Sequence, residues 1–137
     1  VTNYDPHYLG SYKPFTKKTR FKDFNYLNLQ KQLNDILIKK ESNLNMIRCY
    51  FPEKIDDEIF QKISSIKYSF VHVDFDLYKP TLDVIKFVIP RLEKNAIILL
   101  DDYNLINQEG VKWAVRDSGV NISKCIQTQS GQLICYT

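Results

Sequence analysis

This chain has few glycines, no long apolar run and no large excess of one charge. The four glycines among 137 residues lie far apart, so they cannot form a glycine-rich loop for a phosphate or a dinucleotide. No apolar run approaches the ~20 residues of a membrane-spanning helix, and no signal-peptide pattern follows the N-terminus. A net charge of +3 is too small to indicate an anionic partner. We therefore expect no nucleic acid and no membrane as a partner.

Cysteine is also scarce. The three cysteines, Cys49, Cys125 and Cys135, show no C-x-x-C spacing, and their odd number disfavours a disulfide framework or a zinc site. Each lies in a β-like run, which is typical of a buried small hydrophobic residue. Unpaired cysteines suit a reducing compartment, so we expect a cytoplasmic location.

Apolar residues are abundant enough for a globular domain. They make up 44% of the chain and charged residues 26%, which excludes a disordered or collagen-like chain. Residues 1–24 show no period and are interpreted as an irregular N-terminal arm, whereas residues 25–137 are expected to fold. Within that part, leucines and isoleucines at helical intervals predict a helix over 27–40, and an acidic start predicts a second helix over 56–65.

The second half of the chain alternates between strand and helix patterns. Helices are predicted from Pro80 to about residue 92, with Pro90 kinking or shortening the last turn, and over 108–118. Strands are expected at 46–50, 69–74, 96–100, 123–128 and 133–136. The short connection that contains Gly131 predicts an antiparallel hairpin of the last two strands. The pattern favours an α/β fold with a mostly parallel sheet and a C-terminal hairpin. Its expected core consists of Phe70, Val71, Val73, Ile85, Val88, Ile97, Ile98, Leu99, Val115 and Ile134.

Carboxylates follow two of these strands directly. Asp74 and Asp76 come at the end of the strand at 69–74, and Asp101 and Asp102 follow the strand at 96–100. Ligands of open α/β sheets bind beyond the carboxyl ends of the strands, where these four acids are expected to converge. Because so many close carboxylates repel one another, they predict a hard cation, Mg²⁺ first, with Ca²⁺ or Mn²⁺ as alternatives. The alternative is that the acids are helix caps or loop residues on a solvated rim.

Three further side chains near the acids have more than one interpretation. His72 precedes Asp74 by two residues and faces the same side of its strand, so it can bind a carboxylate, act as a base or lie in the core. Tyr78 and Tyr103 each follow an acidic pair and either line a substrate slot or pack over the sheet edge.

These residues carry a resemblance to a known family. The segment 70–115, with DFDLY, then an Arg near a helix end, then LLDDY and a helix with Gly110, Ala114 and Val115, resembles the metal-dependent sugar O-methyltransferases of the macrocin O-methyltransferase type. That resemblance implies a partial Rossmann-like, class I methyltransferase fold. It also implies S-adenosylmethionine and Mg²⁺ or another divalent cation as cofactors, and a sugar or glycoside acceptor with a vicinal hydroxyl.

The resemblance also implies roles for the acids. By comparison with the family, Asp74, Asp101 and Asp102 are expected to bind the metal and Asp76 to act as general base. His72 stays a second candidate base because of its position in the strand. No residue is assigned to S-adenosylmethionine, because the family's glycine-rich turn has no counterpart here. The chain resembles the C-terminal half of the domain. We therefore expect that it is part of a longer protein, that its sheet is rearranged, or that a partner chain or a second copy completes the sheet.

Two other functions are left open by the sequence. A methyltransferase-like module without catalysis, serving binding or assembly, fits the lack of a cofactor turn. A Mg²⁺-dependent phosphohydrolase also uses strand-end aspartates, but its motif has Thr or Val where Tyr78 stands. A metal-binding DxD also occurs in glycosyltransferases, although that reading does not account for Asp101 and Asp102.

Overall fold

The computed structural model describes residues 28, 31–32, 45, 47–104 and 109–137. Residues 50–137 belong to one compact unit and residues 14–49 to a second. In the second unit Asn28, Lys31 and Gln32 are helical and exposed, in the stretch where a helix is predicted over 27–40. The rest of that helix and the arm over 1–24 lie outside the described residues.

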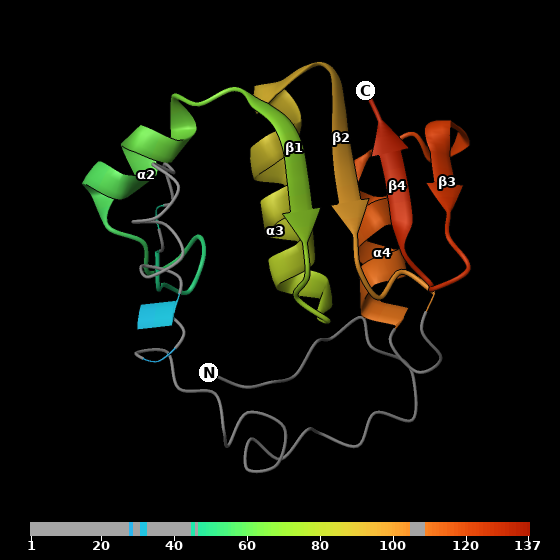
Figure 1. Cartoon of the computed structure of the whole chain (residues 1–137), viewed down its shortest axis with the longest axis horizontal. Helices are drawn as coiled ribbons and strands as arrows, with labels where there is room; N and C mark the ends of the chain where they lie inside the picture. Colours follow the sequence, from blue (N-terminus) through green and yellow to red (C-terminus); the bar gives the residue numbers. More distant parts are fainter. Residues whose placement is uncertain (1–27, 29–30, 33–44, 46, 105–108) are drawn as a thin grey trace. The chain divides into compact units, whose positions relative to one another are not determined.

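The described part of residues 50–137 is a mixed α/β structure with one four-stranded sheet (Figure 1). Its elements are α2 (Asp57–Ser64), β1 (Tyr68–Val73), α3 (Tyr78–Val88), β2 (Leu92–Leu100), α4 (Glu109–Ser118), β3 (Cys125–Gln127) and β4 (Leu133–Tyr136), with 3-10 turns at Ile89–Arg91 and Ile122–Lys124. The α/β class and the strands predicted at 69–74, 96–100 and 133–136 are confirmed. The strand predicted at 123–128 is shorter than expected, because its first part forms the second 3-10 turn.

The strand predicted at 46–50 is wrong for residues 47–50, which form no strand. A strand exists only where a neighbour accepts and donates its backbone hydrogen bonds, and an apolar pattern alone does not supply that neighbour. In its place the N–H of Lys54 donates to the carbonyl of Tyr50 at 2.7 Å, which forms a turn before α2. Residue 46 lies outside the described part.

The strand order is β1-β2-β4-β3. β1 and β2 are parallel, whereas β4 is antiparallel to both of its neighbours, β2 and β3. The predicted hairpin is confirmed, but the sheet is mixed rather than mostly parallel in its pairing. The reason is that β4 inserts between β2 and β3, so three strands share one direction while two of the three pairings are antiparallel.

Local sequence accounts for the helix ends. The Asp56 carboxylate accepts hydrogen bonds from the N–H groups of Glu58 and Ile59, which caps α2. Pro90 ends α3, as predicted, and the chain continues as a 3-10 turn. None of the helices in the described ranges is both long and apolar enough to cross a membrane.

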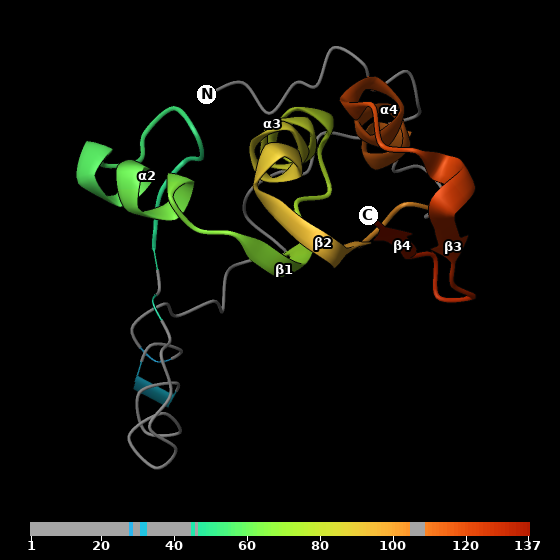
Figure 2. The same ribbon diagram turned by 90° about the horizontal axis from the view of Figure 1, so that it is seen from above.

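The core lies between the sheet and two helices. Figure 2 shows α3 and α4 on the same side of the sheet. Side chains on that side are almost fully buried, among them Val73, Ile85, Val88, Ile98 and Val115 of the predicted core. Val71, Ile97, Leu99 and Ile134 are half-buried. The prediction is wrong for Phe70, which is 58% exposed because it points to the face without helices.

Two of the three cysteines are paired, which corrects the prediction that all three are unpaired. Cys125 and Cys135 form a disulfide, and Cys49 is free. The register of the hairpin places Cys125 directly opposite Cys135. Each cysteine lies five residues from Ser130, the centre of the predicted turn. The predicted hairpin alone therefore placed the two cysteines opposite each other. The cytoplasmic location stays a prediction.

Candidate acidic site

The four acids lie where the two parallel strands end. β1 ends at Val73 and β2 at Leu100, which are direct partners in the register. The ladder continues one step further, because the N–H of Asp101 donates to the carbonyl of Val73 at 2.9 Å. The segments that follow the two strands therefore start side by side at one edge of the sheet.

Three of the four carboxylates meet at this edge. One oxygen from each of Asp74, Asp76 and Asp102 lies within 4.8 Å of the other two, and we call these residues the acidic cluster. Asp74 is exposed, and Asp76 and Asp102 are half-buried. The cluster thus unites two of the predicted metal ligands with the predicted base.

The fourth acid takes a different direction. An oxygen of Asp101 lies 3.9 Å from Nε2 of His72, and the two side chains are 31% and 44% exposed. Its other oxygen accepts a hydrogen bond from the N–H of Asp102 at 3.2 Å. Asp101 therefore contacts His72 and supports the backbone of the cluster. His72 is exposed, so the alternative of a core histidine is wrong.

The backbone of the cluster is unusual. Asp76 and Asp102 have positive φ angles of 57° and 55°. Residues other than glycine rarely adopt this left-handed backbone conformation, although Asp and Asn do so more readily than most. Strained backbone of this kind tends to occur at functional sites. Both residues lie in the segments that follow β1 and β2, and both of their carboxylates belong to the acidic cluster.

Charge repulsion governs the protonation of the cluster. A hydrogen bond with the Asp76 side chain, partial burial and the nearby carboxylates of Asp76, Asp101 and Asp74 raise the pKa of Asp102 to about 7. Near neutral pH Asp102 is therefore partly protonated. A divalent cation would relieve the same repulsion. Three carboxylates at a partly open edge form the all-oxygen donor set that Mg²⁺ and Mn²⁺ prefer, so the residues fit such an ion.

The two tyrosines pack rather than line the cluster. Tyr78 is buried and its hydroxyl donates to an Asp117 carboxylate oxygen at 3.0 Å, which joins α3 to α4. Tyr103 is partly buried against the main core. Both side chains hold the segments that carry the acids, which favours the packing alternative.

A contact that the sequence did not reveal holds the segment after β2. The N–H of Asn104 donates to the carbonyl of Gly131 at 2.8 Å. Gly131 lies in the turn of the hairpin with a φ of 90°, a conformation that suits glycine. The turn between β3 and β4 therefore supports the chain two residues beyond Asp102.

A comparison with models of known protein families finds no match, and a comparison with curated proteins finds none either. The assignment of a function therefore depends on the site and on the fold.

Proposed function

We propose that this chain carries the cation-binding and proton-accepting part of an S-adenosylmethionine-dependent, Mg²⁺-assisted O-methyltransferase that acts on a sugar or a similar vicinal hydroxyl. The observation that carries the proposal is the meeting of Asp74, Asp76 and Asp102 at one edge of the sheet. That edge lies at the carboxyl ends of two adjacent parallel strands, where open α/β sheets bind their ligands.

The order of the strands supports this proposal. β4 is antiparallel and lies between β2 and β3, while the other three strands run in one direction. This arrangement resembles the C-terminal end of the sheet in class I methyltransferases, in which the last strand is inserted antiparallel. A fold alone does not define a function, so the acidic cluster carries the greater weight.

The proposed roles follow from the positions of the acids. Asp74 and Asp102 would hold the cation, Asp76 would lie beside it in the same cluster, and Asp101 would orient this set through its contacts with the Asp102 backbone and His72. A bound divalent cation would offset the negative charge and lower the pKa of a hydroxyl placed beside it. Asp76, which follows β1 at the exit of the strand, would take the proton of that hydroxyl.

A cation-binding module without catalysis is the second candidate. It is favoured by the lack of a glycine-rich turn for S-adenosylmethionine in the 137 residues, so no residue is assigned to that cofactor and no step is derived through it. Both candidates require the acidic cluster, and they differ in whether a methyl donor is bound.

Titration calorimetry separates these functions. The methyltransferase proposal predicts one Mn²⁺ site and a measurable affinity for S-adenosylhomocysteine, which increases in the presence of the cation and an acceptor. Asp57→Asn, an acid in the first turn of α2, is the matched control and should change neither titration. A Mn²⁺ site without any affinity for S-adenosylhomocysteine supports the binding module. Cation-dependent cleavage of a phosphate ester, with no methyl transfer, contradicts both.

The base assignment has its own test. In an assay of methyl transfer, Asp76→Asn should slow the reaction by roughly 10²–10⁴, the usual contribution of a positioned base. His72→Ala should have a much smaller effect, since His72 contacts Asp101 rather than the cluster. Normal transfer by Asp76→Asn together with loss of turnover in His72→Ala would make His72 the base.

A further inference from the structure

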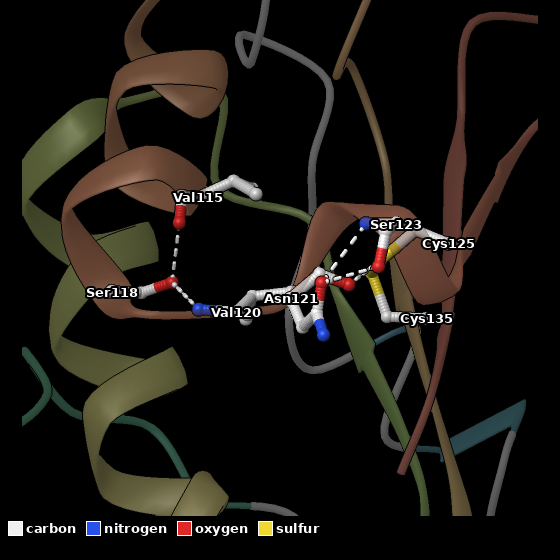
Figure 3. The surroundings of a disulfide bond; sticks show 7 residues. All are labelled: Val115, Ser118, Val120, Asn121, Ser123, Cys125 and Cys135. Carbon is white, nitrogen blue, oxygen red and sulfur yellow. Dashed lines mark hydrogen bonds between the residues drawn. A yellow bond between two sulfur atoms is a disulfide. The ribbon is translucent and has the colours of Figure 1, made fainter.

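The C-terminal hairpin is closed by the disulfide at its open end. Cys125 is the first residue of β3, and its register partner Cys135 lies near the end of β4. Cys135 is 3% exposed and belongs to the core, whereas Cys125 is half-buried. Figure 3 shows the sulfur bridge beside Asn121 and Ser123, in the segment that leads from α4 into β3.

Few other interactions hold β3. The strand has three residues, lies at one end of the strand order and pairs with β4 alone among the described strands. Its central side chain, Ile126, is 58% exposed and contributes little buried apolar area. A short edge strand with one neighbour has a low local stability, so the disulfide supplies much of its restraint.

The hairpin extends from this disulfide to the acidic edge of the sheet. Its turn is closed by hydrogen bonds from the N–H of Gly131 to the Thr128 carbonyl and from the N–H of Gln132 to the Thr128 hydroxyl. The carbonyl of Gly131 accepts the N–H of Asn104 at 2.8 Å. A change in the position of the hairpin therefore reaches the segment that follows Asp102.

A cavity lies beside one of the two cysteines. A cavity of about 330 Å³ is lined by Cys135 together with Val120, Asn121 and Lys124. A thiolate must reach one of the two sulfur atoms for exchange to occur. Glu93 and Lys124 place one negative and one positive charge on the wall of the cavity, so the wall does not exclude a charged thiol such as glutathione.

We propose that the Cys125–Cys135 disulfide is a redox-responsive clamp that fixes the hairpin and, through Gly131, the Asn104 segment. Reduction proceeds by attack of a thiolate of the glutathione class on one sulfur, which breaks the bond between Cys125 and Cys135. A second thiol then attacks the mixed disulfide. The two steps together transfer two electrons and two protons to the pair, so both cysteines become thiols. The two reductant molecules are released as their own disulfide. The clamp acts whether or not the proposed methyltransferase function is correct.

The clamp can be tested on the full chain by residue-specific amide hydrogen exchange at a series of glutathione couples, with the disulfide followed by mass spectrometry. Reduction should speed exchange at Asn104 and in the hairpin by about tenfold or more beyond any change at the amides of β1, which report global opening. It should also lower the melting temperature by roughly 5–10 °C, as expected for opening a loop of this length.

Two variants make the test specific. Cys125→Ala should behave like the reduced protein and no longer respond to reductant, and Cys49→Ser should respond like the original chain because Cys49 is free. The measurement on the unsubstituted chain does not depend on how the variants fold. Free thiols at Cys125 and Cys135 in an oxidising couple overturn the proposal. A disulfide that stays closed in a couple as reducing as a cytosol also overturns it, as does unchanged exchange at Asn104 after reduction.

Discussion

The two faces of the sheet differ sharply in burial although both are apolar in sequence. On the side of α3 and α4, Val73, Ile98 and Leu100 are at most 2% exposed. On the other side Phe70 is 58% exposed and Tyr136 is 44% exposed. Adjacent residues of one strand thus have opposite environments, since side chains alternate between the faces of a strand.

This difference shows why a continuous apolar run is an ambiguous signal. Such a run predicts a strand buried on both faces, as in parallel sheets covered by helices on each side. Within the described residues, helices cover one face only. The alternation of burial therefore sets which substitutions are costly, and it can be tested residue by residue.

The largest expected effect comes from a charge placed on the helix-covered face. Val73→Asp should unfold the domain, because an unpaired buried carboxylate costs several kcal/mol. Phe70→Asp, three residues earlier on the exposed face, should cost about 1 kcal/mol or less. Urea unfolding of both variants measures the contrast. Equal losses of stability would mean that the second face is covered as well.

Shortening a buried side chain at the end of β2 tests the same comparison of the two faces, with a smaller effect. Leu100→Ala should lower the free energy of unfolding by about 2–5 kcal/mol, because Leu100 is fully buried and a cavity would remain. Leu99→Ala, on the opposite face and half-buried, should cost about 1 kcal/mol. A greater loss for Leu99→Ala would reverse the assignment of the faces.

The acidic edge adds a pH dependence to the stability. The pKa of Asp102 is about 7 in the folded chain, compared with 3.8 for an unperturbed Asp, as in the unfolded chain. The folded state therefore binds the proton more tightly. This contribution to stability is complete below pH ~4 and is lost as the pH rises through about 7. In a chelating buffer, the melting temperature of the original chain should decrease from pH 5 to pH 8. This decrease should be about 2–5 °C larger than the decrease of the Asp102→Asn variant over the same range. A fall of the same size in the variant would exclude Asp102 as the cause.

The smallest expected effect concerns the irregular start of β2. Asn95 has a φ of 64°, just before Ala96 begins the alternation of buried and exposed side chains. Asn95→Gly should change the stability by about 0.5 kcal/mol or less, in the stabilising direction, and Asn95→Val should cost about 1–2 kcal/mol. Thermal unfolding of the pair is the measurement, and a stabilising valine would contradict the left-handed backbone.

Local patterns predicted the elements well, and long-range contacts were the part that the sequence did not contain. The Asp56 cap, Pro90 and the Gly131 turn each act over a few residues, so their effects were predictable. The insertion of β4 beside β2 depends on pairing across more than 30 residues, and a pattern of apolar residues does not encode it.

The candidate site shows the same division. Acids that end neighbouring parallel strands were expected to meet, and three of them do. Which three was not predictable, because the left-handed backbone at Asp76 and Asp102 and the contact between Asp101 and His72 arise only in the folded chain. The support of Asn104 by Gly131 likewise depends on the position of the hairpin.

The central claim is that Asp74, Asp76 and Asp102 form a cation site while Asp101 supports it from outside. Mn²⁺ titration by calorimetry, comparing Asp102→Asn with Asp101→Asn, tests it most directly. The account predicts that Asp102→Asn abolishes or weakens binding by about tenfold or more, whereas Asp101→Asn has a smaller effect, in the range of a supporting contact. Undetectable binding of Mn²⁺ by the unsubstituted chain, or a greater loss in Asp101→Asn than in Asp102→Asn, would contradict it.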